Sequence, residues 1–214
     1  MTIEIRDTLF GDLPFAEWPG DDALAEAEPW RSFAKARREA EAGNEAAAKA
    51  TLNGILKMEQ LEARHYLQAW HFLRSLGEAP GSDQAKRVYG VVVEVAMPEG
   101  LDIVAAYEDL SARYFNYSGA AVIWEHPNGE LDEQLEQQLE AGRMVVAQIG
   151  PWEGERPGPP PEGQARISML TPSGIHFGQA PLDALAGDPM GGRVIGAAIN
   201  LMQALIAKTD QGNS

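Results

Sequence analysis

The densest run of β-forming residues in the chain lies between residues 88 and 125. Its first part, residues 88–97, is almost continuously apolar and rich in valine, and β-branched side chains fit a pleated strand. Strands that are covered on one face only alternate apolar and polar residues. The continuous run therefore predicts a central strand that is buried on both faces. Pro98 and Gly100 follow it and predict a turn.

Three further strands are expected directly after this turn, at residues 102–108, 111–117 and 120–125. Short turn sequences separate them, among them Ser118-Gly119. Strands that are joined by such short turns pair with their neighbours in antiparallel fashion. The pattern therefore predicts a four-stranded antiparallel meander.

Helical and strand patterns are combined in the part of the chain after the meander. Leucines at every fourth position predict an amphipathic helix over residues 131–142. A buried strand is expected at residues 144–149 (MVVAQI), and a hairpin is expected from residues 165–171 and 175–179. A helix over residues 189–208 is apolar nearly all round, which fits either a core helix or a contact between copies of the chain.

Helical spacing dominates the chain before the sheet. Residues 30–76 predict three helices, and Gly43 and Gly77 end the first and the third. Residues 77–86 (GEAPGSDQAK) are the best candidate for a boundary, because glycine and proline cluster there between helical and β-rich composition. Residues 1–29 mix prolines with large apolar residues, so we expect an extended arm that packs on a neighbouring element.

Taken together, the patterns predict an α+β protein with three parts. Residues 1–29 form the arm, residues 30–80 form a segment of about three helices, and residues 81–214 form a sheet domain. The sheet has about six to seven antiparallel strands packed with helices, and a long helix lies at its C-terminal end. This order of elements resembles that of roadblock, longin and profilin-like domains, which are small sheet-and-helix binding modules.

Within the helical segment, the stretch AGNEAAAKATL resembles one tetratricopeptide-type repeat. Gly43, Ala48 and Leu52 fit the small and apolar pattern of that repeat, and the sequence holds no second copy. The resemblance implies a surface that binds peptides or proteins, and it implies no catalysis. A plain helical hairpin explains the same residues.

Charge narrows the range of partners. The 214 residues include 32 acidic and 17 basic side chains, which gives a formal net charge of −15. Residues 81–214 hold 18 acidic and 8 basic side chains. Because such a surface repels phosphate groups, we expect no binding to nucleic acid and no attraction to anionic membranes. An acidic face can bind a basic protein partner, although simple solubility explains the same charge.

Composition also bears on the compartment. The chain contains no cysteine, which excludes disulfides, thiolate metal sites and cysteine nucleophiles. It has no apolar run long enough for a transmembrane helix. Its first residues lack the basic and apolar regions of a secretory signal. We therefore expect a cytoplasmic protein.

Side chains that could carry catalysis are few and scattered. The four histidines, at positions 65, 71, 126 and 176, show no spacing typical of metal ligands, so we expect no metal ion and no cofactor. Ser173 and His176 lie three residues apart across a turn. A serine nucleophile also needs an oriented base and an oxyanion hole, and neither is visible in the sequence. Turn formation is the better explanation of Ser173.

Glu133, Glu136 and Glu140 lie on one side of the helix predicted after residue 131. Paired carboxylates can carry out acid–base chemistry or hold Mg²⁺. Beside a leucine stripe, however, they are far more often the solvated face of the helix. The pair Gly191-Gly192 lacks the spacing of a phosphate-binding loop.

Two features are candidates for contact with a protein partner. Trp152 lies in a loop rich in glycine and proline, and an aromatic residue on a semi-rigid loop suits an interface. Arg113, Tyr114 and Tyr117 combine arginine with aromatic residues, as interfaces often do. The alternatives are packing of Trp152 against the end of the sheet and ordinary cross-strand contacts of the other three.

These observations favour a non-enzymatic binding or adaptor protein, with an inhibitor or immunity-type partner of a basic protein as its specific form. The alternative is a sensor or enzyme with a small-molecule pocket between the sheet and the C-terminal helix, lined by Tyr117, Trp124 and His176. A third hypothesis is a homo-oligomer that assembles through residues 189–208. We favour the first and leave the enzyme hypothesis open.

Overall fold

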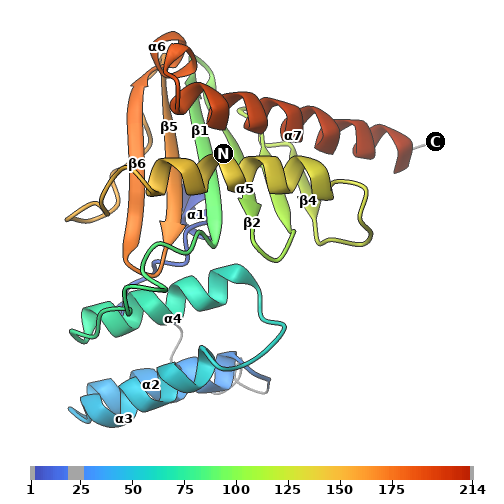
Figure 1. Cartoon of the computed structure of the whole chain (residues 1–214). Helices are drawn as coiled ribbons and strands as arrows, with labels where there is room; N and C mark the ends of the chain where they lie inside the picture. Colours follow the sequence, from blue (N-terminus) through green and yellow to red (C-terminus); the bar gives the residue numbers. More distant parts are fainter. Residues whose placement is uncertain (1–2, 19–26, 213–214) are drawn as a thin grey trace.

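A six-stranded antiparallel sheet lies at the centre of the computed structural model, which describes residues 3–18 and 27–212 (Figure 1). The strand order is β4-β3-β2-β1-β5-β6, so β1 has neighbours on both sides. Val91 and Val93 of β1 belong to one hydrophobic core and Val92 to another, which confirms the predicted burial on both faces. The strands are β1 (Gly90–Met97), β2 (Gly100–Tyr107), β3 (Ala112–Phe115), β4 (Ala121–Trp124), β5 (Gln164–Thr171) and β6 (Gly174–Pro181).

Two helices, α5 (Asp132–Val146) and α7 (Gly191–Gly212), cross one face of the sheet (Figure 1). The leucines predicted as the apolar stripe of α5 are buried there. A methyl group on Gly142 would lie 2.5 Å from Cγ2 of Val91, so α5 reaches its position only because this residue has no side chain. The short helix α6 (Leu182–Gly187) connects β6 to α7.

The strand predicted for residues 144–149 is not formed, and this prediction is wrong. Helix α5 continues to Val146 instead. Val145 and Val146 follow Gly142 by three and four residues, so in a helix they extend the buried face that Leu139 begins. Contact with the sheet core therefore outweighs the β propensity of the two valines.

The other face of the sheet is covered by Leu9, Phe10 and the helix α4. The hydroxyl group of the buried Tyr107 donates a hydrogen bond to the carbonyl oxygen of Leu9 at 2.8 Å, which ties the N-terminal segment to β2. This segment contains a short helix, α1, and a 3-10 turn, η1. The bounds are α1 (Ile3–Asp7), η1 (Phe15–Glu17), α2 (Trp30–Glu41), α3 (Glu45–Ile55) and α4 (Ala63–Ser75).

Helices α2, α3 and α4 share a third core, which is built around Trp18, Phe33 and Phe72. The side chain of Asn44 accepts a hydrogen bond from the backbone of Ala47, as expected of an N-cap at the start of α3. The chain is thus an α+β protein with N-terminal helices, a six-stranded antiparallel sheet and a long C-terminal helix, as the sequence predicts.

A buried ionic cluster joins the N-terminal segment to the sheet. Nε of Arg6 lies 2.5 Å from Oε1 of Glu94, and Nη1 of Arg166 lies 3.6 Å from Oε2 of Glu94. All three side chains are buried. Both arginines also donate to the carbonyl oxygen of Pro157, at 3.1 and 3.2 Å. The cluster therefore connects α1, β1, β5 and the loop before β5.

Candidate functional site

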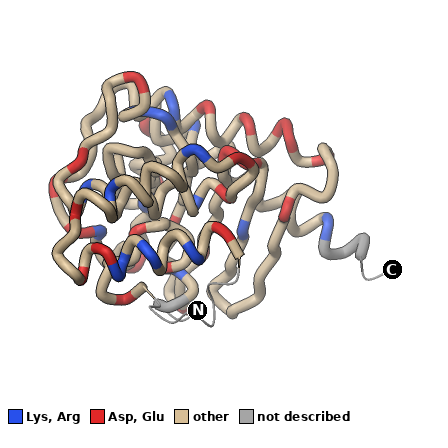
Figure 2. Tube along the Cα trace, turned by 90° about the horizontal axis from the view of Figure 1, so that it is seen from below, with Lys and Arg blue, Asp and Glu red and all other residues tan. Residues whose placement is uncertain are grey.

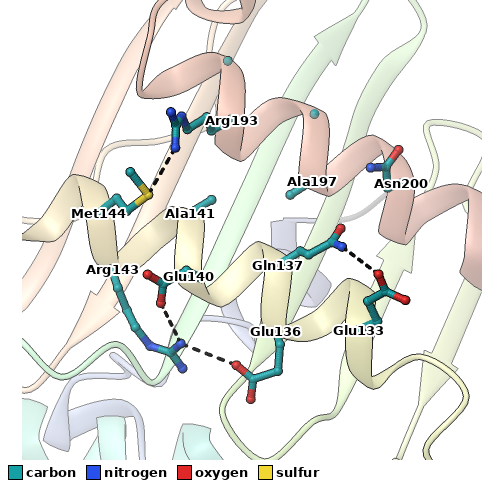
Figure 3. Close-up of a pocket in the computed structure, with 12 residues that line it drawn as sticks. Glu133, Glu136, Gln137, Glu140, Ala141, Arg143, Met144, Arg193, Ala197 and Asn200 are labelled. Atoms are coloured by element: carbon teal, nitrogen blue, oxygen red, sulfur yellow. Dashed lines mark hydrogen bonds and ion pairs between the residues drawn. The ribbon is translucent and has the colours of Figure 1, made fainter.

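An open groove of about 750 Å³ runs between α5 and α7 on the outer side of the molecule (Figure 3). Both helices bury their apolar stripes against the sheet, so their outward flanks form the walls. The lining residues are Glu133, Glu136, Gln137, Glu140, Ala141, Arg143, Met144, Gly192, Arg193, Gly196, Ala197 and Asn200.

The start of α7 is fixed by its cap and by close packing. Oδ1 of Asp188 accepts hydrogen bonds from the backbone of Met190 and Gly191, at 2.9 and 2.7 Å, and these bonds lower the pKa of Asp188. Asp188 thus caps the start of α7. A methyl group on Gly192 would lie 2.4 Å from the carbonyl oxygen of Ala186, so glycine is needed where α6 turns into α7.

Small residues form the floor of the groove. Gly192, Gly196 and Asn200 follow one another at intervals of four and therefore share one flank of α7. A methyl group on Gly196 would meet no other atom within 4 Å. Ala141 from α5 and Ala197 from α7 complete the floor. A segment lying in the groove can therefore approach the backbone of α7 closely.

Acidic side chains line the α5 wall of the groove. Glu133, Glu136 and Glu140 are exposed, in agreement with the predicted solvated face. Nη1 of Arg143 lies 3.4 Å from Glu136 and 3.2 Å from Glu140, and Gln137 donates to Glu133 at 3.2 Å (Figure 3). Exposed ion pairs of this kind add little stability, so a cation of a partner can compete with Arg143 for Glu136 and Glu140.

Met144 adds an exposed apolar surface at one end of the groove. Its sulfur atom lies 3.6 Å from Nη1 of Arg193, which is a weak contact. Methionine adapts its shape to different neighbours and is common on surfaces that bind protein segments.

Charge by itself does not single out this groove. Acidic positions occur along much of the trace, and basic positions are interspersed among them (Figure 2). The excess of acid is therefore a property of the whole chain. The groove is distinguished by its shape and its open floor, together with the carboxylates on one wall.

Trp152 lies beside the edge strand β6, whereas Arg113 and Tyr114 belong to β3, near the opposite edge of the sheet. It is 52 % exposed, and its backbone N–H donates to Ile175 of the edge strand β6. Its indole N–H donates to the carbonyl oxygen of Glu155 at 3.1 Å, and its ring contacts Phe177 edge-on at 5.2 Å. The side chain is thus positioned and still accessible. Its predicted role in partner binding stays a prediction.

The structure does not bring Arg113, Tyr114 and Tyr117 into one exposed cluster. Arg113 is 5 % exposed and donates to the carbonyl oxygens of Ala112 and Trp124, at 2.9 and 3.1 Å. Tyr114 points to the opposite face of the sheet and is 8 % exposed, whereas Tyr117 is 44 % exposed. Of the three, Tyr117 offers the most surface to a partner.

Ser173 and His176 lie within hydrogen-bonding distance, with 3.3 Å between Oγ and Nε2. Nδ1 of His176 donates to the carbonyl oxygen of Ile149 at 3.2 Å, so Nε2 is the acceptor in the neutral ring. The serine hydroxyl, however, is closer to the carbonyl oxygen of Ala85, at 2.7 Å. This bond ties the β5–β6 turn to residue 85, in line with the expected turn role of Ser173.

Burial lowers the pKa of three histidines, His65, His71 and His176. Among the residues that the structure describes, no group of three or more metal-ligating side chains is arranged to hold an ion. Within the same part of the chain, no helix combines the length and the apolar character needed to cross a membrane.

A second, smaller cavity of about 160 Å³ lies between the sheet and α7. Its walls come from Val93, Val95 and Val104 on the sheet and from α6 and α7, and Asp102 is the charged residue in the lining. Tyr117, Trp124 and His176, the residues expected to line a pocket in this region, do not form these walls.

No protein-family model, no curated protein and no solved structure matches this chain. On the α7 side of the groove, sequence reasoning missed Gly196, Ala197 and Asn200. The signal that could have found this flank is the pair Gly192 and Gly196, four residues apart in a helix that otherwise holds large apolar side chains.

Proposed function

We propose that this protein is a non-enzymatic binding module that takes a basic amphipathic helix of a partner protein in the α5–α7 groove. The open floor at Gly196 on α7, beside the carboxylates and the exposed Met144 of α5, is the observation that carries the proposal. In its specific form, the module covers the functional surface of a basic partner, as an inhibitor or immunity-type protein does.

The chemistry of the groove favours a helix with two different faces. Small floor residues admit the apolar side chains of an incoming helix, which is the usual way in which amphipathic helices bind to grooves. Lysine or arginine on the flank of that helix would meet Glu133, Glu136 and Glu140. Such charge pairs mainly raise the association rate and select the partner, and salt weakens them.

A designed peptide provides the first test. The probe is a fluorescein-labelled helix of roughly 18 residues, long enough to be helical, with leucine and alanine on one face and lysine on the other. A matched peptide carries glutamate in place of lysine. Fluorescence anisotropy at low and high salt should show binding of the lysine peptide only, and weaker binding at high salt. Equal binding of both peptides would contradict the charge argument.

Two glycine variants locate the site. Gly196→Leu fills the groove from a position with free space, and Gly54→Leu makes the same change at an exposed helical glycine on α3 that also has free space. Both changes favour the helix, so folding is preserved. Affinity for the lysine peptide should fall at least about tenfold in the first variant, because a filled groove loses its contacts. If both variants bind equally well, the groove is not the site.

Charge reversal tests the wall separately. The double variant Glu133→Lys with Glu140→Lys should abolish the preference for the lysine peptide. Glu99→Lys with Glu153→Lys changes the net charge equally, away from the groove, and should keep most of the preference. The wild type and Gly54→Leu should also capture the natural partner from a native lysate, whereas Gly196→Leu should not.

Size measurement addresses assembly of the chain with itself. If the wild-type protein forms oligomers that Gly196→Leu dissociates, the groove holds a second copy of the chain, and the proposal of a separate partner is wrong.

A further inference from the structure

The cavity of about 160 Å³ is lined by the flank of α7 that faces away from the groove. Helix α7 contributes Ile195, Ala198, Ile199 and Met202 to it, and none of these lines the groove. At 3.6 residues per turn the two sets lie on opposite flanks of the helix. The cavity is therefore a separate feature from the site proposed above.

The walls of the cavity are almost entirely apolar. Val93, Val95 and Val104 form the sheet side, and the lining residues of α7 include Ile199, which is 46 % exposed. An apolar cavity of this size holds a chain of a few methylene groups, and each methylene removed from water raises affinity about fourfold.

One carboxylate breaks this apolar lining. Asp102 pairs with Val95 across the β1–β2 ladder, which places its side chain on the α7 face of the sheet. Its Oδ1 accepts a hydrogen bond from the backbone N–H of Tyr117 at 2.7 Å. No ion pair joins Asp102 to another residue in the described part of the chain. Its second oxygen atom is therefore available to a cation.

The negative charge of Asp102 affects the nearby Tyr114. Burial first, and then the charges of Asp102 and Tyr117, raise the pKa of the Tyr114 phenol. Both tyrosines thus lie close to the carboxylate. The formal net charge of −15 also attracts cations to the protein as a whole.

We propose that this cavity binds an alkylammonium group, with its hydrocarbon stem between the valines and α7 and its ammonium on Asp102. The shape of the site suits the side chain of lysine, which buries its methylenes and keeps its charged end at a polar partner. A carboxylate ligand would be repelled, and an alcohol would lack the ionic contact. The proposal goes beyond the groove and does not depend on it.

The test uses n-butylammonium, the analogue of the lysine side chain, with methyl-detected NMR titration of the full chain. We expect saturable shifts of the methyl groups of Val93, Val95, Val104 and Ile199, with a dissociation constant on the order of 10 mM for so small a ligand. Methylammonium, which lacks the stem, should bind at least about tenfold more weakly. Butyrate should not bind.

Two variants separate the charge from the stem. Asp102→Asn keeps an acceptor for Tyr117 and should weaken n-butylammonium at least about tenfold, whereas Asp183→Asn on α6 should change nothing. Ile199→Ala should weaken binding by a few-fold, with Ile206→Ala on the same helix as its control. Both isoleucines are exposed, so folding is preserved.

Several outcomes would overturn the proposal. These are equal binding of n-butanol, undiminished binding by Asp102→Asn, or no saturable shift. Two further probes, Nα-acetyl-lysine methylamide and 1,5-diaminopentane, show whether the natural alkylammonium group belongs to a protein or to a free amine. Binding of the first supports a lysine of a protein partner, and binding of the second alone supports a free alkylamine. Gly196→Leu should leave all of these shifts unchanged, so failure here is distinct from failure of the groove.

Discussion

Replacement of Arg6 by methionine tests the buried ionic cluster. The change removes the closest cation from Glu94 and keeps most of the apolar stem of the side chain. Breaking a buried ion pair on one side costs about 3–5 kcal/mol, because the remaining charge is left in a medium of low dielectric constant. Arg166 still lies 3.6 Å from Glu94, so we expect the lower end, about 3 kcal/mol.

A loss of this size corresponds to a decrease of about 6–12 °C in Tm for a chain of this length. Urea unfolding followed by circular dichroism gives the free energy directly. Arg87→Met is the matched control, because Arg87 forms its ion pair with Glu108 at the surface and should cost about 1 kcal/mol or less. Adding Glu94→Gln to Arg6→Met should recover part of the loss, since it removes the stranded charge.

The reasoning would be refuted if Arg6→Met cost no more than Arg87→Met. That result would mean that Arg166 or water fully compensates Glu94. A recovery of less than about 0.5 kcal/mol in the double variant would show that lost packing, and not the buried charge, explains the effect.

Gly142→Ala should destabilise the protein by about 1–3 kcal/mol because its methyl group would overlap Val91, whereas Gly196→Ala, in free space, should stabilise it by about 0.5–1 kcal/mol; opposite signs in urea unfolding are the check. Asn44→Ala should cost about 1 kcal/mol through the lost cap of α3, and an unchanged Tm would contradict this. Because burial lowers the pKa of His176, the unfolded state takes up a proton before the folded state does. Stability should therefore fall as pH drops below about 6.5, and His176 contributes up to about 1.4 kcal/mol per pH unit to this fall. A titration of unfolding free energy in which His176→Gln is no flatter than the wild type would disprove this contribution.

The sheet could be predicted because its signal is local. The valine run of β1 and the turns after Met97 and Phe115 can each be predicted from a stretch of a few residues. The end of α5 could not be predicted in this way. Val145 and Val146 favour a strand by propensity, and only contact with the sheet core, which is distant in sequence, keeps them helical.

The candidate sites depend even more on distant contacts. The carboxylates of the groove were recognised as a solvated face, but the floor arises from Gly196 lying beside α5, and no single segment reveals that pairing. Arg113 and Tyr114 illustrate the opposite case. Their residue types suggest a surface, whereas cross-strand neighbours bury both side chains. Trp152 is exposed, as expected of a residue in a loop that is rich in glycine and proline.

The place of β1 between β2 and β5 has a consequence for the order in which the chain folds. β2 follows β1 after a tight turn, but β5 enters only after α5, so the loop that must close is long and its entropy cost is high. Helices α2, α3 and α4, by contrast, follow one another directly in the chain, and their shared core joins residues that are closer in sequence than β1 and β5 are. Refolding should therefore begin in the helices, and the joining of β1 to β5 should set the overall rate.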